Sequence, residues 1–154
     1  MDDNAIDCYL EAGKLARDIL AKGSRGVRAG ASYLAVVETI EAMVRDAGAG
    51  LAFPLNVSVN EDAAHDTASA GDERCFSPGD MVKVDLGVHL DGYIADTAVT
   101  VDLGDHPLLV EASREALSRA IELVCPGIFA GELGGAIQQA IESRGFRPVM
   151  NLTG

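Results

Sequence analysis

Two stretches near the start of the chain carry apolar residues at the three- and four-residue spacing of an amphipathic helix. Residues 4–22 show this spacing and are followed by Gly23; the apolar positions include Ile6, Leu10, Ile19 and Leu20. A second helix is predicted to begin after Ser32, whose hydroxyl suits an N-cap, and to end near Gly48. Its apolar positions are Tyr33, Val36, Val37, Ile40, Met43 and Val44. The chain therefore predicts a pair of helices, each with one apolar face.

The pattern changes from helical spacing to alternation at residues 51–59. Every second residue there is apolar: Leu51, Phe53, Leu55, Val57 and Val59. This alternation predicts a strand with one buried face, on which Phe53 is most simply a core residue. Pro54 places the strand at a sheet edge or a bulge, because proline has no N–H to donate to a ladder. The polar residues 60–79 predict a loop, which contains His65.

Residues 82–102, VKVDLGVHLDGYIADTAVTVD, predict a β-hairpin. Asp-Gly flanked by alternating apolar residues is the strongest short-range hairpin signal, and Asp91-Gly92 is such a pair. A two-residue turn at this pair sets Leu90 opposite Tyr93 and fixes every other pair of the hairpin. One face of the hairpin is then almost entirely apolar, and the other carries the charged residues.

Two aspartates fall on the charged face of this hairpin. In the predicted register Asp85 and Asp96 are diagonal neighbours, about 7–8 Å apart at the backbone, and their direct partners Ala98 and Gly87 are small. Such a face is either solvated, as in many antiparallel hairpins, or a cation site. Like charges placed together destabilise a ladder, and Lys83 is the only cationic residue near them in sequence. A divalent cation, which prefers hard oxygen ligands, would account for the pair.

The last third of the chain returns to helical spacing. Pro107 is predicted to open a helix that ends at Pro126-Gly127, and a further helix ends at Gly145. The final segment, FRPVMNLTG, predicts the start of a strand. Helices, strands and helices in this order predict an α+β fold without linkers or repeats.

Composition narrows the class of protein. The chain has 154 residues, of which 48% are hydrophobic, and its formal net charge is −12. This charge argues against nucleic acids and anionic membrane surfaces as main partners, because both require basic patches. The cysteines, Cys8, Cys75 and Cys125, are odd in number and form no CxxC motif, which predicts reduced thiols in a cytoplasmic protein. The sequence shows neither a signal peptide nor an apolar run of bilayer length.

Three segments of the chain resemble one enzyme family. KVDLGVHLDGYIADTAVTVDLG looks like the metal-binding hairpin of the methionine aminopeptidases. LAFPLNVSVNEDAAHDTAS is similar to the segment that carries their substrate-contacting histidine, and NLTG resembles the lead-in to a further metal-binding histidine. The residues of all three segments resemble the type 2 branch of the family, which is archaeal and eukaryotic-like. The resemblance covers essentially the whole chain.

The resemblance implies a fold, an activity and a set of site residues. It implies half of a pita-bread fold, in which residues 1–154 form the N-terminal part of a single metallopeptidase domain. It also implies removal of the N-terminal methionine from peptides and nascent proteins, with two divalent ions (Co, Mn, Fe, Zn or Ni) as cofactor. Asp85 would bind one ion, Asp96 would bridge both, and His65 would hydrogen-bond the substrate or the tetrahedral intermediate. Phe53 would line the pocket for the methionine side chain, and the complete enzyme is expected to be a monomer.

The sequence departs from the family in the number of metal ligands that it contains. Members of the family use a further histidine and two glutamates, and the histidine is expected immediately after the NLTG that ends at Gly154. We therefore expect the N-terminal half of a longer enzyme, inactive alone and weak in metal binding. Two alternatives stay open: a relative of prolidase or of proline-specific aminopeptidases, which share an Asp pair at this spacing, and a non-catalytic pita-bread interaction module.

Overall fold

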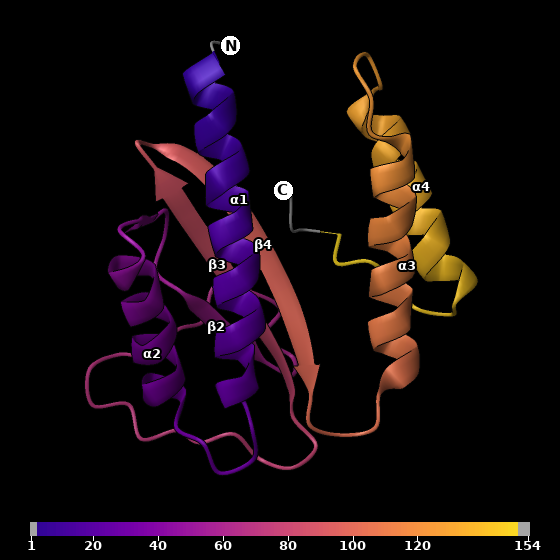
Figure 1. Cartoon of the computed structure of the whole chain (residues 1–154). Coiled ribbons are helices and arrows are strands. Elements are labelled where there is room, and N and C mark those ends of the chain that lie inside the picture. Colours follow the sequence, from indigo (N-terminus) through magenta and orange to yellow (C-terminus); the bar gives the residue numbers. More distant parts are fainter. Residues whose placement is uncertain (1–2, 151–154) are drawn as a thin grey trace. The chain divides into compact units, whose positions relative to one another are not determined.

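The computed structural model describes residues 3–150. They divide into two compact units, and the boundary falls between Asp105 and His106. The first unit contains helix α1 (Asp3–Gly23), the short 3₁₀ helix η1 (Ser24–Gly26), helix α2 (Tyr33–Asp46) and strands β1 (Gly50–Leu51), β2 (Asn56–Val59), β3 (Met81–Leu90) and β4 (Tyr93–Asp102). The second contains helices α3 (Pro107–Leu123) and α4 (Ala130–Ser143). Figure 1 shows these elements along the chain. That residues 1–154 belong to a single domain stays a prediction.

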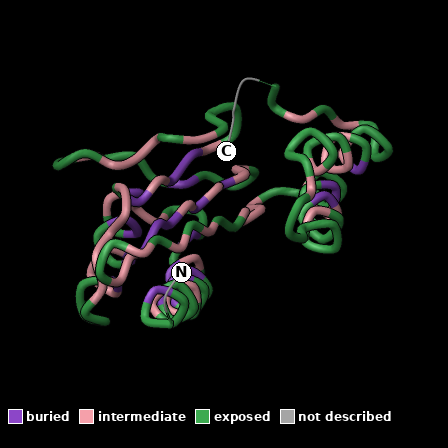
Figure 2. Tube along the Cα trace, turned by 90° about the horizontal axis from the view of Figure 1, so that it is seen from above, coloured by how far each residue is buried: buried purple, intermediate pink, exposed green. Residues whose placement is uncertain are grey.

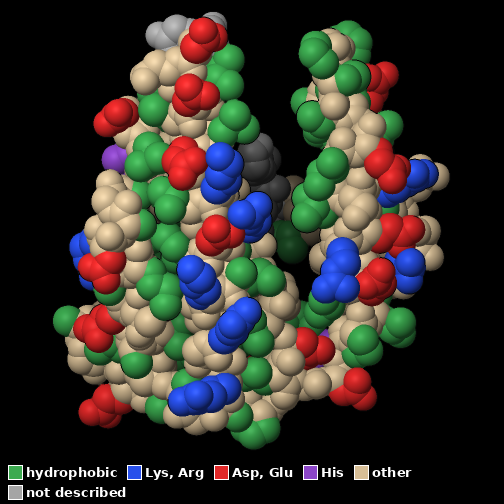
Figure 3. Space-filling model, viewed as in Figure 1, with side chains coloured by type: hydrophobic (Ala, Val, Ile, Leu, Met, Phe, Trp, Pro, Cys, Tyr) green, Lys and Arg blue, Asp and Glu red, His purple; other side chains and the backbone are tan. Residues whose placement is uncertain are grey.

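Both N-terminal helices form where the apolar spacing predicts them. The Ser32 hydroxyl accepts a hydrogen bond from the Ala35 amide at 3.3 Å, which confirms Ser32 as the N-cap of α2. In α1 the first turn holds Asp3 and the last turn holds Lys22. Figure 3 shows acidic side chains toward the N-terminal end of α1 and Lys and Arg side chains toward its other end. This distribution complements the helix dipole and stabilises the helix.

Strand β3 is the centre of the sheet. It pairs antiparallel with β4 over its whole length and, on its other edge, with β1 and β2 at different stretches. Helices α1 and α2 lie on one side of this sheet (Figure 1), and the alternating burial along the strands is visible in Figure 2. The core between them is apolar and includes Ile19, Leu20, Val36, Val37, Ile40, Val44, Leu55, Val57, Val82, Val84, Leu86 and Val88. The opposite face of the sheet is therefore the one that carries the polar residues.

The hairpin has the predicted turn and register. Asp91 and Gly92 have φ values of 52° and 87°, the left-handed conformation at both central positions that a type I′ turn requires. The pairs run without interruption from Leu90 opposite Tyr93 to Met81 opposite Asp102. The predicted positions of Asp85 and Asp96 on the strands and of Asp91 in the turn are confirmed.

The prediction of a single strand at residues 51–59 is wrong, because the chain forms two short strands there. Leu51 is the last residue of β1 and pairs with Val88, whereas Asn56 is the first residue of β2 and pairs with Asp85. Four residues, 52–55, thus stand opposite two residues of β3. Pro54 lies in this interruption and has no N–H for the ladder, which fits the bulge that its position predicts.

The second unit is an antiparallel pair of helices. Arg144 and Glu115 form an ion pair at 2.6 Å between the end of α4 and α3, and the buried positions Ala112, Ala116 and Ala140 allow close packing. The strand predicted from Phe146 is wrong for residues 146–150, which are irregular. Within residues 106–150 there is no strand with which they could pair, and Pro148 lacks an N–H. The NLTG motif at residues 151–154 lies outside the described residues.

None of the helices within residues 3–150 is long and apolar enough to cross a membrane.

Candidate functional site

The four site residues predicted from the sequence line one pocket on the polar face of the sheet. The pocket has a volume of about 410 Å³ and is lined by Phe53, Asn56, His65, Asp85 and Asp96. These residues come from the interruption before β2, from β2, from the loop at residues 60–79 and from both strands of the hairpin. The fold therefore brings together side chains that are up to 43 positions apart (53 to 96) in the sequence.

The two carboxylates form the electrostatic centre of this pocket. Asp85 pairs with Ala98 and Asp96 pairs with Gly87, both of which are small, and the Phe53 ring takes up the space over Gly87. Burial raises the pKa of the Asp85 carboxyl above its ordinary value, and the charge of Asp96 raises it further, while the Asn56 amide acts in the opposite direction. The Oδ1 atom of Asp85 is buried and accepts no hydrogen bond from any residue of the described chain. A buried acceptor without a hydrogen-bond donor costs about 1–3 kcal/mol.

The donor chemistry of this pair fits a divalent cation. Two convergent carboxylates and an unpartnered buried oxygen are what a hard cation neutralises and ligates. The ligand set is incomplete, however, because residues 3–150 contain no group of three or more His, Cys, Asp or Glu placed to hold a metal. Divalent ions take four to eight ligands each, so Asp85 and Asp96 supply part of a coordination shell.

His65 occupies an exposed position with an unusual backbone. Its φ of 65° lies in the left-handed region, which costs a residue other than glycine about 1–3 kcal/mol unless its surroundings fix it. The residue after it is fixed: the Asp66 amide donates to the buried Ser58 hydroxyl at 3.2 Å, and the Asp66 carbonyl accepts from Val57 at 2.7 Å. The Thr67 hydroxyl donates to the Leu55 carbonyl at 2.6 Å. These bonds tie the loop to β2 directly beside the pocket.

Phe53 lies in the pocket because the strand is interrupted. Simple alternation predicts Phe53 on the same face as Leu55 and Val57, which are fully buried in the core. Instead the extra residues at 52–55 turn Phe53 to the polar face, where its ring lies over Gly87 so closely that a Cβ on that glycine would overlap it. The interpretation of Phe53 as a core residue is therefore wrong.

Sequence reasoning missed Asn56. This residue is directly opposite Asp85 in the β2–β3 ladder and shares its face of the sheet. The signal that could have found it is its position one residue before the core residue Val57, which places Asn56 on the other face. That signal identifies a partner for Asp85 only when the pairing of β2 with β3 is known.

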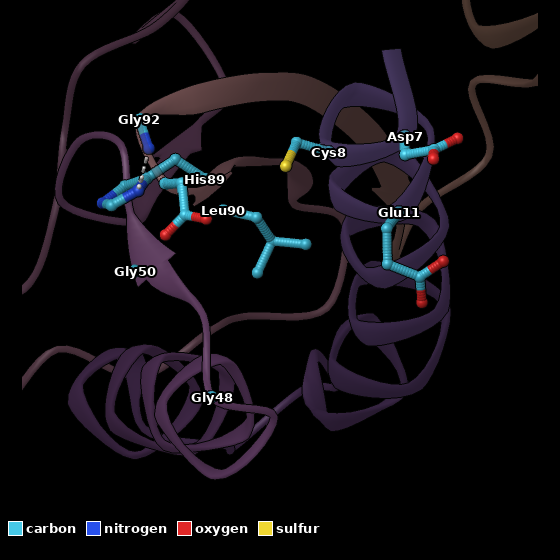
Figure 4. A pocket seen from close by; sticks show the side chains of 9 residues that line it. Asp7, Cys8, Glu11, Gly48, Gly50, His89, Leu90 and Gly92 are labelled. Carbon is cyan, nitrogen blue, oxygen red and sulfur yellow. Dashed lines mark hydrogen bonds between the residues drawn. The ribbon is translucent and has the colours of Figure 1, made fainter. Parts of the chain in front are cut away.

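A larger hollow of about 600 Å³ lies between the start of α1 and the hairpin turn (Figure 4). Cys8 and Leu90 point into it, whereas the carboxylates of Asp7 and Glu11 point away from it. His89 accepts a hydrogen bond from the Gly92 amide on its Nδ1 atom at 3.3 Å and so supports the turn. Because these polar groups do not converge on one point, the smaller pocket with the two aspartates is the better candidate site.

Comparison with known proteins identifies the family. The sequence signature of metallopeptidase family M24 matches residues 7–154. The chain belongs to this family. It is 47% identical over 154 residues to a methionine aminopeptidase of Archaeoglobus fulgidus, an alignment that covers 100% of the chain and 53% of that relative. The chain thus spans about half the length of the curated relatives it matches.

Solved structures agree with this M24 assignment. A methionine aminopeptidase from Thermotoga maritima superposes with a TM-score of 0.91 at 28% identity, over 100% of this chain and 66% of that one. A prolidase from Pyrococcus furiosus gives a TM-score of 0.84 at 24% identity, over 94% of this chain and 44% of that one, which shows the fold alone. The predicted α+β half of a pita-bread fold and the resemblance to archaeal methionine aminopeptidases are confirmed. Metallopeptidases depend on divalent metal, in agreement with the chemistry of the aspartate pair.

Proposed function

We propose that this M24 chain supplies the metal-binding hairpin and the substrate-facing histidine of a methionine aminopeptidase. The observation that carries the proposal is the single pocket in which His65, Asp85 and Asp96 meet. The curated relatives, which are methionine aminopeptidases, favour this activity over that of a prolidase. The substrates would be the N-terminal methionines of peptides and nascent proteins in the cytoplasm.

Asp85 and Asp96 would hold the metal, and we propose two divalent ions, drawn from Co, Mn, Fe, Zn and Ni. A bound divalent ion supplies a Lewis acid for the scissile carbonyl and lowers the pKa of a bound water. Asn56 is placed to orient the Asp85 carboxylate from the neighbouring strand. The aspartate pair would thus act through its negative charge, which a divalent ion would compensate.

His65 and Phe53 would act on the substrate. The His65 imidazole would donate a hydrogen bond to the oxygen on which negative charge develops, and a positioned donor of this kind stabilises a transition state more than a ground state. Phe53 would contact the methionine side chain, because its ring forms an apolar wall of the pocket beside the carboxylates. Together they would orient the first peptide bond over Asp85 and Asp96.

Metal binding tests the role of the aspartates. We expect the 154-residue chain to bind Mn(II) weakly in isothermal titration, because two carboxylates are too few for a tight site. Asp85→Asn and Asp96→Asn should abolish this binding. Asp91→Asn is the matched control, since it removes a carboxylate from the same hairpin but at the turn, where Asn accepts a positive φ equally well. Equal binding by all four proteins would contradict the proposal.

Peptide hydrolysis tests the expected inactivity of the 154-residue chain and, should the chain be active, its class. With Co(II) or Mn(II) added, the purified 154-residue chain is expected to release no methionine from Met-Ala-Ser, because the ligand set within residues 3–150 is incomplete. Release of methionine would show that this expectation of inactivity is wrong while supporting the activity itself. Release of the first residue from Xaa-Pro peptides instead would assign the chain to the prolidase class.

A further inference from the structure

The segment that carries His65 is held by a residue outside the pocket. Arg74 is not among the described residues that line the pocket, yet its guanidinium contacts both residues that follow His65. Its Nη1 atom donates to the Asp66 carboxylate at 2.7 Å, and its Nη2 atom donates to the Thr67 carbonyl at 3.0 Å. Arg74 is therefore positioned to determine where the chain runs immediately after the histidine.

Arg74 is itself fixed on several sides. Its Nε and Nη2 atoms donate to the Asp72 carboxylate at 2.9 and 2.7 Å, and its backbone amide donates to the same carboxylate at 2.8 Å. The guanidinium lies over the Tyr33 ring, 4.6 Å from its centroid, and the Tyr33 amide donates to the Arg74 carbonyl at 3.0 Å. Tyr33 is buried at the start of α2 and stacks on Phe76. This chain of contacts connects the His65 segment to the core.

The arrangement depends on the planar, forked shape of the guanidinium. The edge of the guanidinium donates hydrogen bonds to two carboxylates and one carbonyl, while its face lies on an aromatic ring. A lysine ammonium could retain the charge but could not make these contacts at once. The hydrogen bonds from Arg74 also hold the pKa of the Asp72 carboxyl below its ordinary value. Without Arg74, the carboxylates of Asp66 and Asp72 would repel each other and the loop would lose its central cation.

We propose that Arg74 is a positioning residue that holds residues 65–67 so that the His65 side chain faces Asp85 and Asp96. The inference deepens the proposed function, since it is the role given to His65 there that makes its position matter. The Arg74 side chain is 46% exposed, so solvent weakens its contribution to global stability. Its effect is instead local, on a loop that is otherwise held by its hydrogen bonds to β2 and to Leu55.

The test compares Arg74→Ala and Arg74→Lys with the unchanged 154-residue chain by NMR, without metal. In Arg74→Ala the Val57 and Asp66 amides, which bond the loop to β2, should exchange with solvent at least tenfold faster. The carbon-bound imidazole protons of His65 should shift, while those of His89 and His106 serve as internal controls and stay unchanged. Arg74→Lys should restore neither readout. Arg17→Ala is the matched control, since Arg17 is an exposed arginine on α1 that pairs with its neighbour Asp18 at 2.8 Å.

The outcomes separate this inference from the proposed function. Selective changes at His65 and at the two amides support positioning by Arg74, whatever the metal titration shows. Unchanged amide exchange and unchanged His65 signals in Arg74→Ala would overturn it, even if Asp85 and Asp96 bind Mn(II). Should Arg74→Ala fail to fold, Arg74→Lys decides: faster exchange at Val57 and Asp66 with unchanged His89 and His106 signals supports the inference, and wild-type behaviour overturns it.

Discussion

Adding one methyl group at Gly87 is expected to destabilise the first unit and to disturb the pocket. A Cβ at this position would lie 2.7 and 2.8 Å from the Phe53 Cδ1 and Cζ atoms, whereas carbon atoms in contact are normally about 3.5–4.0 Å apart. Phe53 must therefore move by roughly 1 Å, and overpacking of this kind costs about 1–3 kcal/mol. Replacing glycine with alanine returns about 0.4–1 kcal/mol by restricting the unfolded chain. The expected net effect of Gly87→Ala is a loss of up to about 2.6 kcal/mol, or about 1.3 kcal/mol from the mid-range values.

Urea unfolding followed by circular dichroism measures this loss. Gly13→Ala is the matched control, because the same methyl group added in α1 meets no atom within 4 Å. It should stabilise the unit by up to about 1 kcal/mol, since alanine is the better helix former. The same chemical change thus has opposite signs at the two positions. A Gly87→Ala protein as stable as the Gly13→Ala protein would refute the close contact between Phe53 and Gly87.

A double-mutant cycle isolates the cause of the loss. In a Phe53→Ala background the overlap is absent, so adding the methyl group at Gly87 should cost nothing and should recover the gain expected from glycine to alanine. The coupling between the two positions is then about as large as the overpacking term, about 1–3 kcal/mol. Equal cost of Gly87→Ala in both backgrounds would show that the strand backbone, and not the Phe53 ring, opposes the substitution.

Three further predictions concern the aspartates and a helix cap. Asp85→Asn should stabilise the metal-free chain by up to about 1 kcal/mol at pH 7 in urea unfolding, since it removes one of two like charges. This advantage should shrink as the pH falls through the raised pKa of Asp85, where protonation removes the same charge from the wild type; a constant advantage would contradict the assignment. Asp72→Asn should show the reverse, a loss of stability at pH 7. This loss should disappear as the pH falls below the ordinary carboxyl pKa of 3.8 toward the lowered pKa of Asp72. An unchanged loss at pH 2 would contradict this prediction. Ser32→Ala should lower the free energy of unfolding by about 1 kcal/mol, measured by thermal unfolding, because it removes the N-cap of α2. Ser32→Asp should keep most of the stability that the cap provides, because aspartate is also a good N-cap.

The hairpin could be predicted from the sequence because everything that fixes it is local. Asp91-Gly92 sets the turn, and the two-residue period then assigns each side chain to a face. Asp85 and Asp96 come together through this rule alone. The two N-terminal helices are predictable for a similar reason, since their apolar spacing and the Ser32 cap lie within single segments.

The rest of the pocket depends on contacts between distant segments. The alternation at residues 51–59 does not reveal that four residues stand opposite two of β3, because that mismatch exists only in the ladder. For this reason the alternation alone could not place Phe53 and Asn56 on the pocket face, and only the resemblance to a family pointed to Phe53. His65 came from the resemblance to a family, since no local pattern brings a loop histidine to a hairpin. The segment that begins at Phe146 has the composition of a strand, but residues 106–150 contain no strand with which it could pair.

The two-residue turn also limits how this gene can change in length. If one residue is inserted between Asp91 and Gly92 and the turn keeps two residues, every pair of the hairpin shifts by one, so that Asp96 moves to the helix-covered face opposite Val88. A carboxylate would then enter the core and the pocket would lose one of its two charges. Insertions or deletions of two residues would leave each side chain on its face. We therefore expect an odd change in length to leave Asp96 in the pocket only where a longer loop or a bulge absorbs the extra residue.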